Sequence, residues 1–210
     1  MYKLKILTLL LLFIVLWSCV GSNATTMEYR SAKTSVRSEN NLIKGEELGL
    51  KALAMPEHQN DAQVAYFLAI EIYKPKKKWE KMNEMLDLAF SINPTQPLER
   101  AFSMPDGTFV QTIEEGVAVY KEELWIQAFN NGIDLADKGH LEKAVAQFNF
   151  AKNILNRIES YIASYAIYLE LSNVSGANNK EYLVKAKEVL DVEKVIASIL
   201  LLEDLSRQKN

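Results

Sequence analysis

The chain has 210 residues, of which 49% are hydrophobic and 24% are charged, so it can bury the core of a folded domain. Five prolines and eight glycines are too few for a largely disordered protein. The formal net charge of −3 gives no support for a nucleic-acid partner, and we expect none.

The first nineteen residues differ in character from the rest of the chain. Lys3 and Lys5 form a short basic start, and a mostly apolar run follows from Ile6 to Trp17. This run is shorter than the roughly 20 apolar residues that span a bilayer. It has the length and charge order of a secretory signal. The only cysteine, Cys19, comes directly after it, so no internal disulfide can form.

The tetrapeptide Leu16-Trp17-Ser18-Cys19 resembles the lipobox of bacterial lipoproteins. The resemblance implies that residues 1–18 are a signal peptide removed before Cys19. It also implies that Cys19 carries a diacylglycerol thioether and an acylated amino group, with palmitate as a typical chain. Several acyl chains together make a stable membrane anchor. An ordinary signal peptide or an uncleaved anchor, with an incidental cysteine, is the alternative.

The residues after Cys19 bear on where the anchor is held. Val20-Gly21 lacks the aspartate that signals retention at an inner membrane. By resemblance to enterobacterial sorting rules, this favours the outer membrane, and the lack of an acidic cluster favours its periplasmic face. Gly21 to about Glu39 is rich in Ser, Thr and Asn without an apolar period. We therefore predict a lipidated flexible tether over residues 19–40.

A helical domain is predicted over residues 41–210. Apolar residues recur at helical spacing over about 42–54, and Pro56 ends that helix. Asp61 is placed to cap a helix over 62–73. Another helix is expected over 79–92, where Asn93-Pro94 closes it.

The middle of the chain has a different pattern. Residues 95–111 show no clear period and contain a Pro-Asp-Gly turn signal. Phe102 and Phe109 flank this turn, and either pair across a short hairpin or pack under the helices. A capping box at Thr112 predicts a helix that starts at about Ile113. Since no breaker separates it from Trp125, we expect one long helix over about 113–138.

The stretch from Trp125 to Asn156 predicts two packed helices joined by a turn at Gly139, since glycine tolerates positive φ. Ala144 and Ala151 lie two turns apart on one face, with Phe148 between them. Small residues there allow a neighbouring helix to approach closely. One such hairpin cannot bury its apolar face alone, so we expect it to recur.

The same order of residues does recur. The spacing of Leu135, Ala144, Phe148, Ala151 and Asn156 is repeated 62 residues earlier by Tyr73, Met82, Leu86, Ala89 and Pro94. A third copy places Ile162 and Ala166 34 residues after Ala128 and Gly132, and its second helix is offset by 35. We assign the extra residue to the loop at 173–179. A last, unusually apolar helix is predicted from Val192 to about Ser206.

This order resembles the tetratricopeptide repeat of a bacterial lipoprotein. The resemblance implies an all-α solenoid of helical hairpins, with one irregular middle repeat and an apolar C-terminal capping helix. It also implies a concave groove, lined by the first helix of each hairpin, that binds peptides or proteins. By register, the groove residues would be Phe67, Glu71, Lys74, Phe129, Asn130 and Ile133. Phe67 and Phe129 either anchor an apolar side chain or belong to the core.

The sequence lacks recognisable motifs for catalysis or for binding a metal or cofactor. His58 and His140 each fall in a predicted turn, where we expect solvated side chains. There is no metal-ligand, phosphate-loop or nucleophile motif, and we expect no enzymatic activity, metal or cofactor. Lysines cluster between 74 and 81. They belong either to a solvated turn or to a surface for anionic lipid or an acidic partner.

The sequence therefore favours a lipid-anchored periplasmic scaffold that binds a protein or peptide partner in the bacterial cell envelope, and that assists assembly of an envelope complex. The alternative is a glycan- or nutrient-binding lipoprotein of an outer-membrane uptake system. That role calls for exposed aromatic platforms, for which Trp79, Trp125 and Tyr168 are the candidates.

Overall fold

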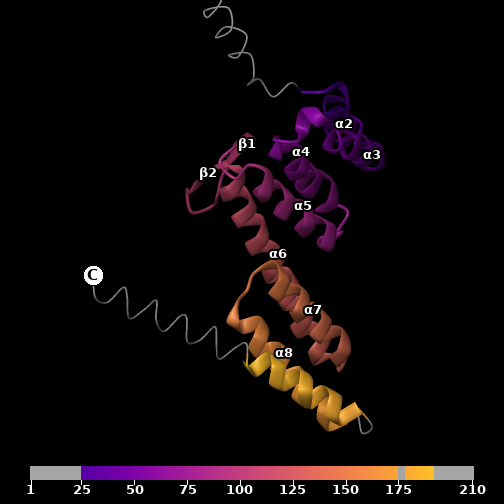
Figure 1. The fold of residues 1–210 in the computed structure, drawn as a ribbon, viewed down its shortest axis with the longest axis vertical. Coiled ribbons are helices and arrows are strands. Elements are labelled where there is room, and N and C mark those ends of the chain that lie inside the picture. The colour runs from indigo at the N-terminus through magenta and orange to yellow at the C-terminus, as the bar shows by residue number, and fades with distance from the viewer. Residues whose placement is uncertain (1–24, 175–177, 192–210) are drawn as a thin grey trace, which may run out of the picture. The chain divides into compact units, whose positions relative to one another are not determined.

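The computed structural model describes residues 25–174 and 178–191. Cys19, the signal peptide and the predicted last helix from Val192 to Ser206 lie outside the described residues. The described part is mostly helical with one short β-hairpin, which confirms the helical class and adds two strands to it (Figure 1). Contacts divide the chain into two compact units after Glu114. Of the described helices, none combines the length and apolarity needed to cross a membrane.

The first unit begins with α2 (Met27–Arg37), and the tether prediction is wrong for these residues. Thr26 caps the helix through its side-chain oxygen. Tyr29, Ala32 and Ser35 form its buried face. Composition misled here because two of these three residues are small or polar, so the buried stripe is not visible as an apolar period.

The second helix, α3 (Leu42–Leu53), packs closely against α2 and agrees with the prediction. Asn41 caps it by accepting a hydrogen bond from the Lys44 amide. A Cβ added at Gly45 would lie 2.3 Å from the Val36 Cγ2 atom, so the two backbones meet where glycine is required. The 3₁₀ turn η1 (Pro56–His58) follows.

The next hairpin also agrees with the prediction. Helix α4 (Ala62–Phe67) continues as the π-helix η2 (Leu68–Tyr73), and α5 (Trp79–Ile92) returns along it. Asp61 caps α4, because its Oδ1 atom accepts a hydrogen bond from the Gln63 amide at 3.1 Å. Gly49 of α3 faces Leu68, which joins the two hairpins in one core.

The irregular middle region is the antiparallel hairpin of β1 (Pro97–Ser103) and β2 (Phe109–Thr112). Gly107 has a φ of +88° in the connecting turn. Of the two alternatives left open by the sequence, the short hairpin is present, but the two phenylalanines do not pair with each other across it. Phe102 lies opposite Val110, and Phe109 lies opposite Ser103 with 51% of its surface exposed.

Helix α6 (Ile113–Asp137) begins where the capping box predicted and is continuous, as expected from the lack of a breaker; it starts at the end of the first unit and continues into the second. Gly139, at φ +74°, turns the chain into α7 (Leu141–Ile154). The ring of Phe148 fills the space beside Gly132, where an added Cβ would lie 2.6 Å from it. This is the close helix approach that the small residues predicted.

Helix α8 (Ile158–Val174) and a helix over 179–191 complete the second unit. Their core is formed by Leu141, Ala144, Phe148, Ile167, Tyr168, Leu171, Ala186 and Val189. The predicted 34-residue register of α8 fails at two positions and fits at a third. Ile162 is 48% exposed and Ala166 is also exposed, whereas Ile167 is buried. Leu169, which lies 34 residues after Leu135, packs against the core.

Candidate functional site

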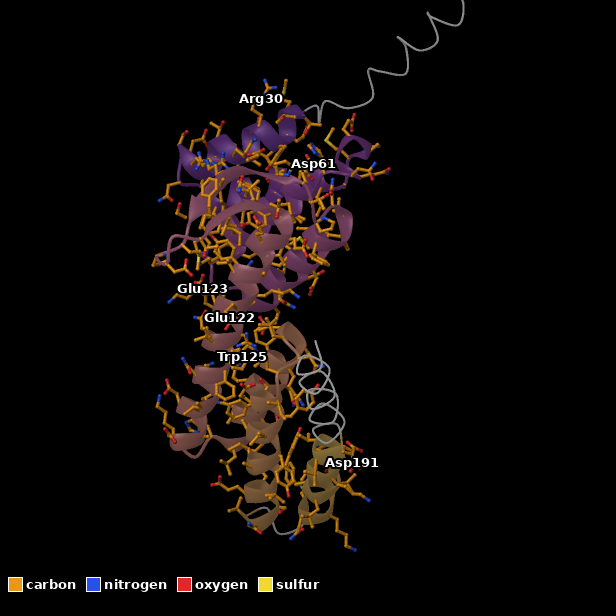
Figure 2. The ribbon with its side chains drawn as sticks, turned by 90° about the vertical axis from the view of Figure 1, so that its left-hand side faces the viewer. Arg30, Asp61, Glu122, Glu123, Trp125 and Asp191 are labelled. Atoms are coloured by element: carbon orange, nitrogen blue, oxygen red, sulfur yellow. The ribbon has the colours of Figure 1, made fainter. Side chains whose placement is uncertain are left out.

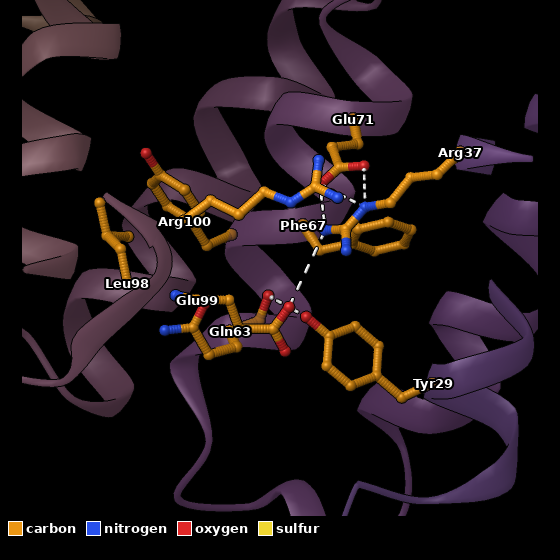
Figure 3. A pocket seen from close by; sticks show the side chains of 9 residues that line it. Tyr29, Arg37, Gln63, Phe67, Glu71, Leu98, Glu99 and Arg100 are labelled. Atoms are coloured by element: carbon orange, nitrogen blue, oxygen red, sulfur yellow. Dashed lines mark hydrogen bonds and ion pairs between the residues drawn. The ribbon is translucent and has the colours of Figure 1, made fainter. Parts of the chain in front are cut away.

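A small charged pocket lies in the first unit where α2, the α4–η2 helix and β1 meet (Figure 3). Its volume is about 40 Å³, far below the roughly 300 Å³ at which ligand pockets begin. We call it the charged pocket, and it is lined by Tyr29, Arg37, Gln63, Tyr66, Phe67, Glu71, Leu98, Glu99 and Arg100.

Arg37 is the central cation of the charged pocket. Its Nε atom donates to Glu71 Oε2 at 2.8 Å, its Nη2 atom also donates to Glu71, and Glu99 Oε2 lies 3.8 Å away. The hydrogen bonds to Glu71 raise the pKa of Arg37. Lys33 pairs with Glu99 at 2.8 Å. These ion pairs cross-link α2 to η2 and to β1, so the pocket's charges largely neutralise one another.

Arg100 differs from the other charged residues of this pocket, which form ion pairs. Figure 3 shows its guanidinium turned toward Glu71 and Arg37. Within the described part of the chain it makes no hydrogen bond or ion pair.

The predicted groove residues of the first unit have different environments. Phe67 is 3% exposed, and its ring lies 5.6 Å from that of Tyr29, so it is a core residue. Glu71 is engaged by Arg37. The structure therefore brings Phe67 and Glu71 together at the charged pocket, whereas Lys74 follows η2 and does not line it.

The lysines between 74 and 81 largely have partners within the fold. Lys76 forms an ion pair with Glu46 of α3, and Lys78 lies 3.6 Å from the same carboxylate. Lys81 lies over the ring of Tyr73, 5.5 Å from its centroid. Burial and the neighbouring Glu46 raise the pKa of Tyr73 to about 12. These contacts support the reading of this segment as a structural turn.

His58 is buried, at 1% exposure, and the prediction of a solvated side chain is wrong. Its Nδ1 atom lies 2.8 Å from Asp61 Oδ2, and its Nε2 atom lies 2.9 Å from Thr26 Oγ1. Asp61 Oδ1 also accepts from Gln96 Nε2 at 2.7 Å. Both ring nitrogens are engaged and shielded from solvent, so His58 joins the starts of α2 and α4 rather than serving chemistry. The spacing of three residues between His58 and Asp61 was the sequence signal that could have indicated this pairing.

In the second unit, four residues of α6 form a continuous surface, which we call the α6 stripe: Ile126, Phe129, Asn130 and Ile133. Their spacing of three, four and seven residues places them on one helix face. Ile126 and Ile133 are 45% and 41% exposed, and Asn130 is exposed. The three residues predicted here thus lie together, and Ile126 is the one that the prediction missed.

Phe129 and Trp125 form the base of the α6 stripe. Their rings stack at a centroid distance of 5.0 Å, and Phe129 also lies 5.4 Å from Phe148. Trp125 donates to Ser160 Oγ at 3.0 Å, and the Arg157 guanidinium covers its ring at 4.5 Å. Trp125, whose position Figure 2 labels, is therefore held against α8 and offers no open aromatic platform.

A larger cavity, of about 350 Å³, lies among α7, α8 and the helix at 179–191. We call it the second-unit cavity, and it is lined by Lys152, Tyr161, Tyr168, Lys185, Glu188 and Val189. Tyr168 was a predicted aromatic candidate. The other residues were missed because three helices supply them, and only packing sets the helices' mutual register.

No known family matches the chain. Neither the models of protein families nor the curated proteins yield a match to its sequence. The described residues contain no group of three or more His, Cys, Asp or Glu side chains placed to hold a metal ion. The functional reading therefore depends on the geometry of the chain's own surfaces.

Proposed function

We propose that the protein is a lipid-anchored scaffold of tetratricopeptide-like hairpins that binds an apolar segment of a partner protein in the bacterial cell envelope. Cys19 would carry the anchor, with the folded part at the periplasmic face of the outer membrane. The binding surface would be the α6 stripe.

Contacts at a regular sequence separation support the repeat arrangement. The Tyr29 hydroxyl donates to the Gln63 carbonyl 34 residues later, and Arg37 Nε donates to Glu71 at the same separation. In the second unit, Arg157 Nη1 donates to Glu122 at a separation of 35. Successive hairpins that stack in the same orientation produce such constant separations.

The observation that carries the binding proposal is the exposure of Ile126 and Ile133 on one face of α6. Two branched apolar side chains, Ile126 and Ile133, flank Asn130 along this face of α6. Exposed apolar side chains grouped on one face are typical of a protein-binding surface, in which polar groups surround an apolar centre. We assign the partner an apolar side chain for the isoleucines and a backbone amide for Asn130.

Photo-crosslinking in intact cells tests this proposal. A crosslinker placed at position 126 or 133 should capture one envelope protein, and the Ile126→Ser/Ile133→Ser variant should recover much less of that same protein by pull-down. Position 184 is the matched control, since Val184 is 56% exposed on another helix of the same unit. Equal capture from position 184, or capture of lipid alone, would refute the proposed surface.

The glycan- or nutrient-binding alternative is favoured by one observation. Of its three aromatic candidates, Trp125 is covered and Trp79 is half-buried in the first unit; Tyr168 is 9% exposed, but it borders the second-unit cavity. That cavity is the place where such a ligand would bind.

A further inference from the structure

The second-unit cavity has the size of a small-molecule site. Its volume of about 350 Å³ lies within the range of roughly 300–1,000 Å³ that is typical of ligand pockets. Lys152 of α7, Tyr161 and Tyr168 of α8, and Glu188 of the helix at 179–191 supply most of its polar groups. None of these residues belongs to the α6 stripe.

Lys152 is a half-buried cation with no ion-pair partner in the part of the chain that the structure describes. Its Nζ atom lies 5.0 Å from the centroid of the Tyr161 ring, and within the described residues it makes no ion pair. Burial alone lowers the pKa of this ammonium group. A cation that has lost solvent without gaining a counterion favours an anion entering the cavity.

The second lysine of the cavity is already neutralised. Lys185 pairs with Glu181 at 2.5 Å and lies 5.5 Å from the centroid of the Tyr182 ring. Among the described lining residues, Lys152 is therefore the lysine that remains without an ion pair, and it can accept one carboxylate rather than several.

The other residues that line the cavity determine which kind of ring the ligand would have. Tyr161 and Tyr168 provide aromatic walls, and the Tyr168 ring is held by Tyr182 at 6.4 Å and by Asn149, which donates to its hydroxyl at 3.4 Å. Glu188 repels a second acidic group, but it accepts hydrogen bonds from hydroxyl groups. A ring with an apolar face, several hydroxyls and a single carboxylate satisfies all of these groups.

We propose that the second-unit cavity binds a free sugar acid, with its carboxylate on Lys152, its ring against Tyr161 and Tyr168, and a hydroxyl group on Glu188. Among the described lining residues, one lysine without an ion pair and one carboxylate, Glu188, disfavour a polyacidic peptide.

Calorimetric titration of the full-length protein in detergent tests this assignment. D-galacturonic acid is the probe, and D-galactose is its neutral counterpart. Galacturonate should bind saturably, and galactose at least tenfold more weakly, because it lacks the charged group. Lys152→Met should weaken galacturonate binding at least tenfold, Lys152→Arg should restore most of it, and Lys187→Met, at an exposed position on the neighbouring helix, should leave it unchanged.

Circular dichroism melting of each variant establishes that it is folded, so a loss of binding is read only from a folded variant. If galacturonate fails to bind, if Lys152→Met binds it as well as the wild type, or if a tetra-aspartate peptide binds more tightly, the assignment is wrong. Ile126→Ser/Ile133→Ser should bind galacturonate normally. The proposals for the second-unit cavity and for the α6 stripe can therefore be supported or refuted separately.

Discussion

Tyr29 shows how single residues hold the first unit together. Its hydroxyl donates to the Gln63 carbonyl at 3.2 Å, and its ring meets His58 and Phe67 edge-on at 5.5 and 5.6 Å. Lys33 covers the ring at 4.2 Å. One side chain from a segment predicted to be a tether thus contacts both α4 and the buried His58.

Burial, followed by the carboxylates of Glu99 and Asp61, raises the pKa of Tyr29 well above its usual value of 10.0. Above pH 10 the unfolded chain loses this proton while the folded chain keeps it, so the unfolded state binds fewer protons. The free energy of unfolding should therefore fall as pH rises above 10.

Tyr29→Phe should lower stability by about 1 kcal/mol at neutral pH, because the hydrogen bond to Gln63 is lost. It should also make the alkaline fall less steep. Urea unfolding at pH 7, 10 and 11 measures both effects, with Tyr165→Phe of the second unit as the control. An unchanged alkaline slope in Tyr29→Phe would show that Tyr29 is not the group responsible.

At the scale of elements, helix-capping residues and helix breakers allowed the ends of helices to be predicted from the sequence. The helices over 62–73, 79–92 and 141–154 begin and end where Asp61, Pro94 and Gly139 indicate. Such signals act locally, so they can be read without knowledge of the packing. The helix α2 has a Thr26 cap of the same kind. Its buried face combines Tyr29 with small or polar residues, however, and no apolar periodicity identifies it.

Gly45 tests the contact between α2 and α3. Alanine normally stabilises a helix interior by up to about 1 kcal/mol relative to glycine. At position 45 the added Cβ would lie 2.3 Å from Val36, so Gly45→Ala should instead destabilise the protein by about 1–3 kcal/mol. In the Val36→Ala background the same change should cost much less, because the obstructing methyl is gone.

A double-mutant cycle by urea unfolding measures this coupling. Strictly additive effects of the two substitutions would mean that α2 and α3 do not approach as described.

At the scale of the whole molecule, some features could be predicted from the sequence and others could not. It indicated the helical class, and the register of the tetratricopeptide resemblance placed Phe129, Asn130 and Ile133 on one helix. It could not show that Phe67 is buried against Tyr29 or that Glu71 is engaged by Arg37, since α2 was not recognised. The second-unit cavity depends on three helices and left no local signal.

The membrane anchor is a property of the whole molecule that one residue tests. Cys19→Ala should move the protein from the membrane fraction to the soluble fraction, because the lipobox cysteine is the proposed site of acylation. Fractionation with metabolic labelling by a palmitate analogue measures this. Labelling and membrane association that persist in Cys19→Ala would contradict a lipid anchor at this residue.

The affinity of the crosslinked partner for the α6 stripe tests the central claim most directly. Each buried isoleucine contributes about 1.5–3 kcal/mol, so Ile126→Ser/Ile133→Ser should raise the Kd for the purified partner at least 100-fold. The Leu183→Ser/Val184→Ser control, on the exposed face of the neighbouring helix, should change it less than threefold. Equal losses for the two double variants, or no loss for Ile126→Ser/Ile133→Ser, would contradict a scaffold that binds through α6.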